Sequence, residues 1–70
     1  MAELPGAAVK RVIGKGSGDL RISGSAIQLA VAAAEGYLDR LGREAGTIAA
    51  RERRKTIMDG DIQKAREVVG

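Results

Sequence analysis

The sequence contains no cysteine and no histidine among its 70 residues. Without cysteine there are no disulfides or thiolate ligands, and without either residue zinc fingers, thiol nucleophiles and imidazole acid–base chemistry are excluded. The carboxylates pair naturally with arginine at helical spacing, as in Asp39 and Arg43. We therefore expect no enzymatic activity, no metal site, no cofactor and no small-molecule substrate.

Aromatic residues are almost missing, because Tyr37 is the only one. Twelve of the apolar residues are Ala, and the larger ones are five Leu, six Ile, five Val, Met58 and Tyr37. Below roughly 70–80 residues a single core rarely supplies enough stability without disulfides or a metal. One small domain over residues 1–70 is expected, and its thin core predicts an obligate homo-oligomer with Tyr37 in the core.

Long hydrophobic runs are missing as well. The longest uncharged stretch, residues 22–34, has thirteen residues and includes Ser and Gln, which is too short and too polar for a membrane span. The first residues have no basic segment followed by an apolar one, as a secretory signal would. We expect a cytoplasmic protein with no membrane partner.

Apolar spacing predicts three helices and no sheet, an all-α fold. The first runs from about Pro5, which suits a first helical position, to Ile13, and the glycine-rich stretch 14–18 ends it. The second runs from about Gly24 to Arg51, with Ser23 or Ser25 as its cap. At 1.5 Å per residue it spans roughly 42 Å, too long for its own chain to cover.

A third, short amphipathic helix follows the basic stretch 51–55. Thr56 and Ile57 are β-branched and suit a short extended piece. Asp59 is then expected as the cap, with Asp61 in the first turn. The expected layout is short helix, loop, long helix, loop, short helix.

The glycines of the long helix and those of the first loop can each be interpreted in two ways. Inside the long helix, Gly36, Gly42 and Gly46 are either tolerated surface residues or points where two long helices cross closely. In the first loop, Gly-Lys-Gly-Ser-Gly lacks the spacing of a P-loop. It is either a helix stop or a loop whose backbone and Lys15 approach a phosphate.

Positive charge is concentrated near the ends of the expected helices. Residues 51–55 hold four cations and one anion, and Lys10, Arg11, Lys15 and Arg21 surround the first loop. Between Ala26 and Ala50, by contrast, two Arg face three acids. This segregation, within a net charge of +3, is typical of an electrostatic footprint for nucleic acid.

The layout and several short stretches resemble archaeal-type histones along nearly the whole chain. These stretches are Ala2-Glu3-Leu4-Pro5, Arg11-Val12-Ile13, Arg21-Ile22-Ser23, Arg54-Lys55-Thr56-Ile57, Asp61-Ile62 and Ala65. The resemblance implies the histone fold, in which two chains form an intertwined head-to-tail dimer with crossing long helices. It implies a chromosome-associated homodimer that binds double-stranded DNA without sequence preference, through paired loops and first-helix N-termini, and bends or wraps it.

The resemblance also implies roles for individual residues. Arg21 matches the arginine inserted into the minor groove, Arg11 matches a phosphate contact of the first helix, and Lys55 and Thr56 match phosphate contacts of the second loop. Arg54 and Asp61 match a structural salt bridge. With the neighbouring cations, the expected DNA-binding residues are Lys10, Arg11, Lys15, Arg21, Arg53, Lys55 and Thr56.

Two departures from the family pattern leave the assembly open. The first loop is one residue longer and richer in glycine, and Arg51 stands where a histidine often joins dimers. Ile48, Arg51 and Asp61 are expected at a contact between dimers, unless two Arg51 side chains repel and assembly stops at the dimer. The alternative function is a histone-fold dimerisation module that acts through a protein partner in a transcription-type complex.

Overall fold

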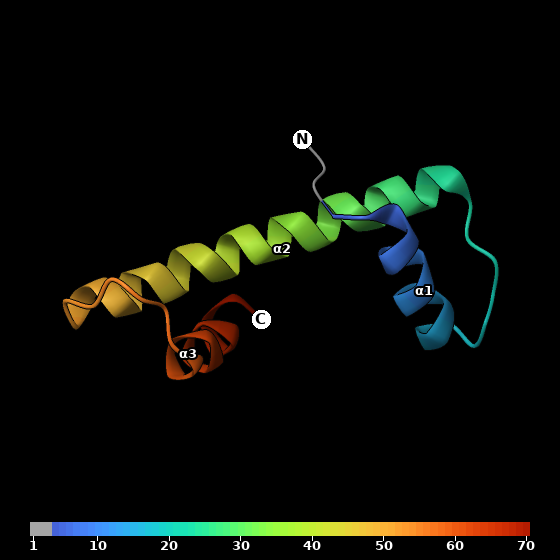
Figure 1. Ribbon diagram of the computed structural model, residues 1–70. Helices are drawn as coiled ribbons and strands as arrows, with labels where there is room; N and C mark the ends of the chain where they lie inside the picture. Colours follow the sequence, from blue (N-terminus) through green and yellow to red (C-terminus); the bar gives the residue numbers. More distant parts are fainter. Residues whose placement is uncertain (1–3) are drawn as a thin grey trace. The chain divides into compact units, whose positions relative to one another are not determined.

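The computed structural model describes residues 4–70, which form three helices, α1 (Gly6–Gly16), α2 (Gly24–Arg51) and α3 (Asp59–Val69) (Figure 1). This part of the chain contains no strand, so the predicted all-α layout and the bounds of the long helix are confirmed. Met1, Ala2 and Glu3, which belong to the expected domain and to its N-terminal resemblance, lie outside the described residues. Within residues 4–70 no helix is both long and apolar enough to cross a bilayer.

The chain divides into two compact units after Glu35, in the middle of α2. The first unit holds α1, the first loop and the beginning of α2. The second unit holds the rest of α2, the second loop and α3. Each unit carries one group of the expected DNA-binding residues.

The bounds of α1 correct the expectation at both of its ends. Pro5 is the N-cap rather than the first helical residue, and its carbonyl accepts hydrogen bonds from the amides of Ala8 and Val9. The helix continues past Ile13 to Gly16. It continues because capping bonds beyond Gly16 offset the cost of roughly 0.5–1 kcal/mol that an interior glycine carries relative to Ala.

A Schellman motif ends α1. The amide of Gly18 donates to the carbonyl of Lys15 (3.4 Å), and the amide of Asp19 donates to the carbonyl of Gly14 (2.6 Å). Gly18 has a φ of 76°, the left-handed conformation that this motif requires and that glycine adopts without a steric penalty. The glycine that ends the helix is therefore Gly18.

The beginning of α2 is held at two points. The hydroxyl of Ser23 accepts a hydrogen bond from the amide of Ala26 (3.1 Å), so Ser23 rather than Ser25 is the cap. The amide of Leu4 donates to Oε2 of Glu35 (3.1 Å), which ties the segment before α1 to α2. Among residues 4–35, Val31 is the buried apolar residue.

The core of the second unit joins α2 to α3. Leu41, Ala45 and Ala65 are buried, and the side chains packed against them are Tyr37, Ile48, Ile62 and Val69. The expectation that Tyr37 belongs to the core is confirmed, and the guanidinium of Arg40 lies 6.0 Å from the centre of its ring.

The N-terminus of α3 differs from the expectation by one residue. Met58, with extended backbone, precedes the helix, and Asp59 is its first helical residue rather than its cap. The Asp61 carboxylate accepts a hydrogen bond from the amide of Met58 (2.8 Å), and the amide of Asp61 donates back to the carbonyl of Met58 (3.0 Å). Thr56 and Ile57, expected as a short extended piece, lie outside any helix or strand.

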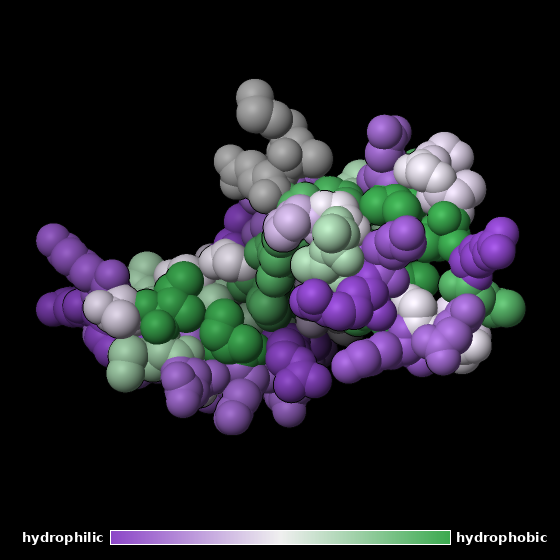
Figure 2. Space-filling view, turned by 45° about the vertical axis from the view of Figure 1, so that its right-hand side comes forward, coloured by the Kyte–Doolittle hydropathy of each residue, from purple (hydrophilic) through white to green (hydrophobic). Residues whose placement is uncertain are grey.

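Many large apolar side chains remain exposed on the single chain. Within residues 4–70 none of the large side chains is fully buried, and Leu29 and Leu20 keep 74% and 69% of their surface exposed. In Figure 2 hydrophobic residues, coloured green, lie at the surface between hydrophilic ones. The chain alone therefore has the thin core that its composition predicted.

Candidate nucleic-acid interface

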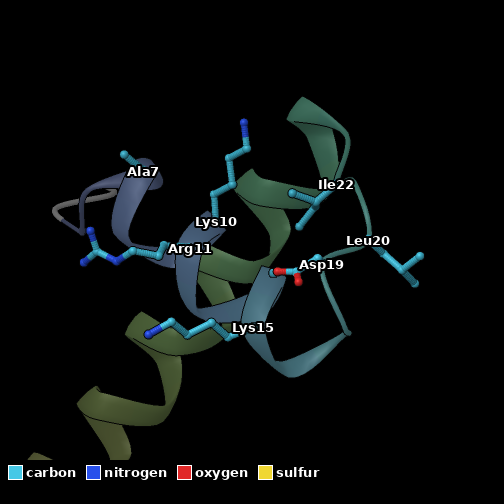
Figure 3. Close-up of a pocket in the computed structure, with 8 residues that line it drawn as sticks. Ala7, Lys10, Arg11, Lys15, Asp19, Leu20 and Ile22 are labelled. Atoms are coloured by element: carbon cyan, nitrogen blue, oxygen red, sulfur yellow. The ribbon is translucent and has the colours of Figure 1, made fainter.

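Three of the expected DNA-binding residues line one depression in the first unit. Lys10, Arg11 and Lys15 are among the residues that line an open hollow of about 450 Å³ beside α1, and their side chains extend from α1 in different directions (Figure 3). Its other lining residues are Ala7, Gly14, Asp19, Leu20 and Ile22. Arg21 does not line this hollow and lies exposed in the segment between Leu20 and Ser23.

A second Schellman motif ends α2 and shapes the second loop. The amide of Arg53 donates to the carbonyl of Ala50 (3.0 Å), and the amide of Arg54 donates to the carbonyl of Ala49 (3.0 Å). Arg53 occupies the position that Gly18 holds after α1, with a φ of 58°. A side chain in this conformation costs roughly 1–2 kcal/mol, because its Cβ approaches the following carbonyl.

Arg54 and Asp61 form the centre of the second loop. The two guanidinium nitrogens Nη1 and Nη2 each donate to one carboxylate oxygen, both at 2.7 Å. Nη1 also donates to the carbonyl of Thr56 (3.0 Å). The structure thus contains the ion pair that the resemblance implied, and it joins the end of α2 to the beginning of α3.

This pair keeps both groups ionised. The hydrogen bonds from Arg54, together with the one from the Met58 amide, lower the pKa of Asp61 from 3.8 to about 2, although burial opposes the shift. The hydrogen bond to Asp61 correspondingly raises the pKa of Arg54 above its ordinary value. The charge of the Arg54 guanidinium is therefore balanced within the chain.

Glu52 also pairs with Arg54 (3.4 Å), and the other polar residues of the second loop are free to meet a ligand. Arg53, Lys55 and Thr56 are exposed, whereas only 30% of the Arg54 side chain is. Exposed cations on a backbone held by internal hydrogen bonds are suited to neutralising phosphates, which requires charge at a fixed position rather than base recognition. Within residues 4–70 no group of acidic side chains is placed to hold a metal ion.

Residues 6–68 match the family model described as "Core histone H2A/H2B/H3/H4 domain". The chain belongs to the core histone family. Its three helices have the histone fold, and this family in general binds DNA, forms dimers and is not enzymatic. A comparison with curated proteins found no significant match.

In this histone chain the three residues expected between dimers have different environments. Arg51 is exposed at the end of α2, but Ile48 packs against the core of its own chain. Asp61 keeps 3% of its surface exposed, and both of its oxygens accept hydrogen bonds from Arg54. Asp61 thus has a role within the chain, and the contact of these three residues between dimers stays a prediction.

Sequence reasoning did not single out one residue of the histone's first loop. Asp19 lines the same hollow as Lys10, Arg11 and Lys15, and its φ of 65° is unusual for a residue other than glycine. The signal in the sequence was Gly18, because a glycine after a helix indicates a Schellman motif that places the next residue against the helix end.

Proposed function

We propose that the chain is an archaeal-type histone whose homodimer binds double-stranded DNA without sequence preference and compacts it by bending or wrapping. The observation that carries this proposal is the second loop. Its central arginine, Arg54, is satisfied internally, whereas Arg53, Lys55 and Thr56 are exposed beside it. Such a loop offers phosphate-binding groups at fixed positions and no array of groups suited to reading bases.

The first unit supplies a second group of cations for the same role. Lys10, Arg11 and Lys15 share one hollow, and Arg21 is exposed beside it as a residue for the minor groove. A homodimer doubles the formal charge of +3 to +6. Its association with the chromosome would then be electrostatic and dependent on salt.

The exposed apolar residues support a dimer of whole chains, each one domain over residues 1–70. Val12, Leu29, Leu38 and Val68 expose half or more of their surface, and a second chain crossing the long helix would cover such side chains. Nothing within 4 Å would meet a Cβ at Gly42 or Gly46. In the proposed dimer these glycines allow the partner's helix to approach.

The first test compares binding to several unrelated duplexes across a range of salt concentrations. We expect similar affinities for all of them and a steep loss of affinity as salt rises. A strong preference for one short sequence at physiological salt would contradict the proposal. Nuclease digestion of the complex then shows whether dimers assemble along DNA, as a ladder of fragments, or bind separately, as one protected length.

The second loop is tested by Lys55→Ala. Loss of one phosphate contact per chain, two per homodimer, should weaken binding to all duplexes alike and flatten the plot of log affinity against log salt by about two units. Lys64→Ala removes the same charge from an exposed position on α3 and should change the slope much less. Equal slopes for the two variants would contradict the role of Lys55.

The exposed apolar surface also favours a second function, a histone-fold module that dimerises with a different protein. Light scattering of the isolated chain separates the two functions. A soluble homodimer that binds DNA supports the first, whereas a chain that is poorly soluble alone and binds no duplex supports the second.

A further inference from the structure

The two helix ends share a hydrogen-bonding motif but carry opposite charges. After α1 the left-handed position is Gly18 and the next residue is Asp19, whereas after α2 the corresponding residues are Arg53 and Arg54. Both motifs position a loop that we propose to contact DNA. The second loop therefore has cations at these two positions, and the first loop has an anion.

Asp19 is held firmly in this position. Its amide bond to the Gly14 carbonyl is 2.6 Å long, and its φ is 65°. Figure 3 shows its carboxylate turned toward α1, whereas the neighbouring Leu20 points away. Asp19 lines the same hollow as Lys10, Arg11 and Lys15.

The charge of Asp19 does little for the fold. Within residues 4–70 its carboxylate forms no ion pair, and the C-terminal end of a helix, where it lies, carries a partial negative charge that disfavours an anion. The left-handed backbone, which Asp tolerates better than most residues with a Cβ, is still less favourable for it than for glycine. A residue with these costs and no compensating contact points to a role outside folding.

We propose that Asp19 weakens the hold of the first loop on DNA phosphates, an inference that rests on the proposed function. The carboxylate lowers the formal charge of the hollow from +3 to +2 and repels a phosphate that approaches the three cations. The first loop then releases DNA at lower salt than the second loop does. Contacts at the two loops are consequently unequal in strength.

The test is the variant Asp19→Asn, which keeps a residue that tolerates the left-handed conformation and removes the charge. If one more phosphate is neutralised per chain, the homodimer neutralises two more, so the salt slope should steepen by about 1.8 and the affinity at 0.1 M salt should rise about 60-fold. Asp19→Gly should give the same result. Glu67→Gln makes the same change of net charge on an exposed position of α3 and should alter affinity less than twofold.

Each other outcome has a distinct meaning. Equal gains from Asp19→Asn and Glu67→Gln would show an effect of net charge and overturn the inference. An unchanged affinity of Asp19→Asn, with wild-type protein that binds DNA, would overturn the inference and leave the proposed function intact. Absence of wild-type binding to any duplex would overturn both. A lower melting temperature of both Asp19 variants would show a structural role instead.

Discussion

Arg53 combines an unfavourable backbone with an exposed positive charge. At the equivalent position after α1 the chain has Gly18, which adopts a positive φ without strain. After α2 it has arginine at a φ of 58°, although glycine would be more stable there. The strain is retained at a loop where Lys55 and Thr56 are also exposed and suited to phosphate contact, so a gain in DNA binding is the physical reason we assign to it.

Arg53→Gly should therefore change stability and DNA binding in opposite directions. We expect the free energy of unfolding to rise by about 1–2 kcal/mol, because the left-handed strain is removed, and the affinity for duplex DNA to fall with the lost cation. Urea unfolding and a salt titration of binding measure the two effects. Arg53→Lys keeps both the charge and the strain and should resemble the wild type in both assays. A glycine variant that is less stable would contradict this account.

At the level of elements, the Arg54 and Asp61 pair connects α2 to α3. It is the only ion pair within residues 4–70 in which one partner is buried, since the Asp61 side chain is 4% exposed whereas Asp39 and Arg43 are 58% and 80% exposed. Asp61 also accepts the Met58 amide at the beginning of α3. One carboxylate thus anchors the loop and completes the N-terminus of a helix.

Asp61→Asn should destabilise the protein more than Asp39→Asn, for which an exposed pair predicts about 0.3–0.5 kcal/mol. The pH dependence of unfolding shows whether the ionised Asp61 carboxylate is the cause of this difference in stability. Because folding lowers the pKa of Asp61 from 3.8 to about 2, its stabilising effect is complete above about pH 4 and is lost as the pH falls toward 2. Unfolding measured between pH 6 and 2 should show a weaker acid dependence in Asp61→Asn than in Asp39→Asn. Identical profiles would contradict this assignment.

The elements differ in how far the sequence predicted them. The bounds of α2 followed from its uninterrupted apolar spacing and a serine cap, and both are local signals. The end of α1 did not, because Gly14 and Gly16 suggest a stop while the capping bonds that extend the helix form only three residues later. The left-handed backbone of Arg53 was not predictable either, since arginine does not signal it. The pair of Arg54 and Asp61 came from the family resemblance and not from periodicity.

For the whole molecule, the apolar surface and the small core point to association. Leu41 is the largest buried side chain of the core cluster, and its two buried neighbours are alanines. A core of this size is marginal for 70 residues. The net charge of +3 is also modest for a DNA-binding protein, and pairing two chains changes both properties together.

If the folded state is a dimer, its melting temperature must rise with protein concentration, because association stabilises the native state by mass action. We expect a clear upward shift over a 100-fold range of concentration, and light scattering should give about twice the chain mass of 7.3 kDa. This association should not weaken as salt rises, unlike electrostatic binding to DNA. Burial of apolar surface does not weaken with salt, whereas the repulsion between two +3 chains does. A melting temperature independent of concentration, together with a mass of 7.3 kDa, would show that the exposed apolar side chains remain uncovered and that the dimer does not form.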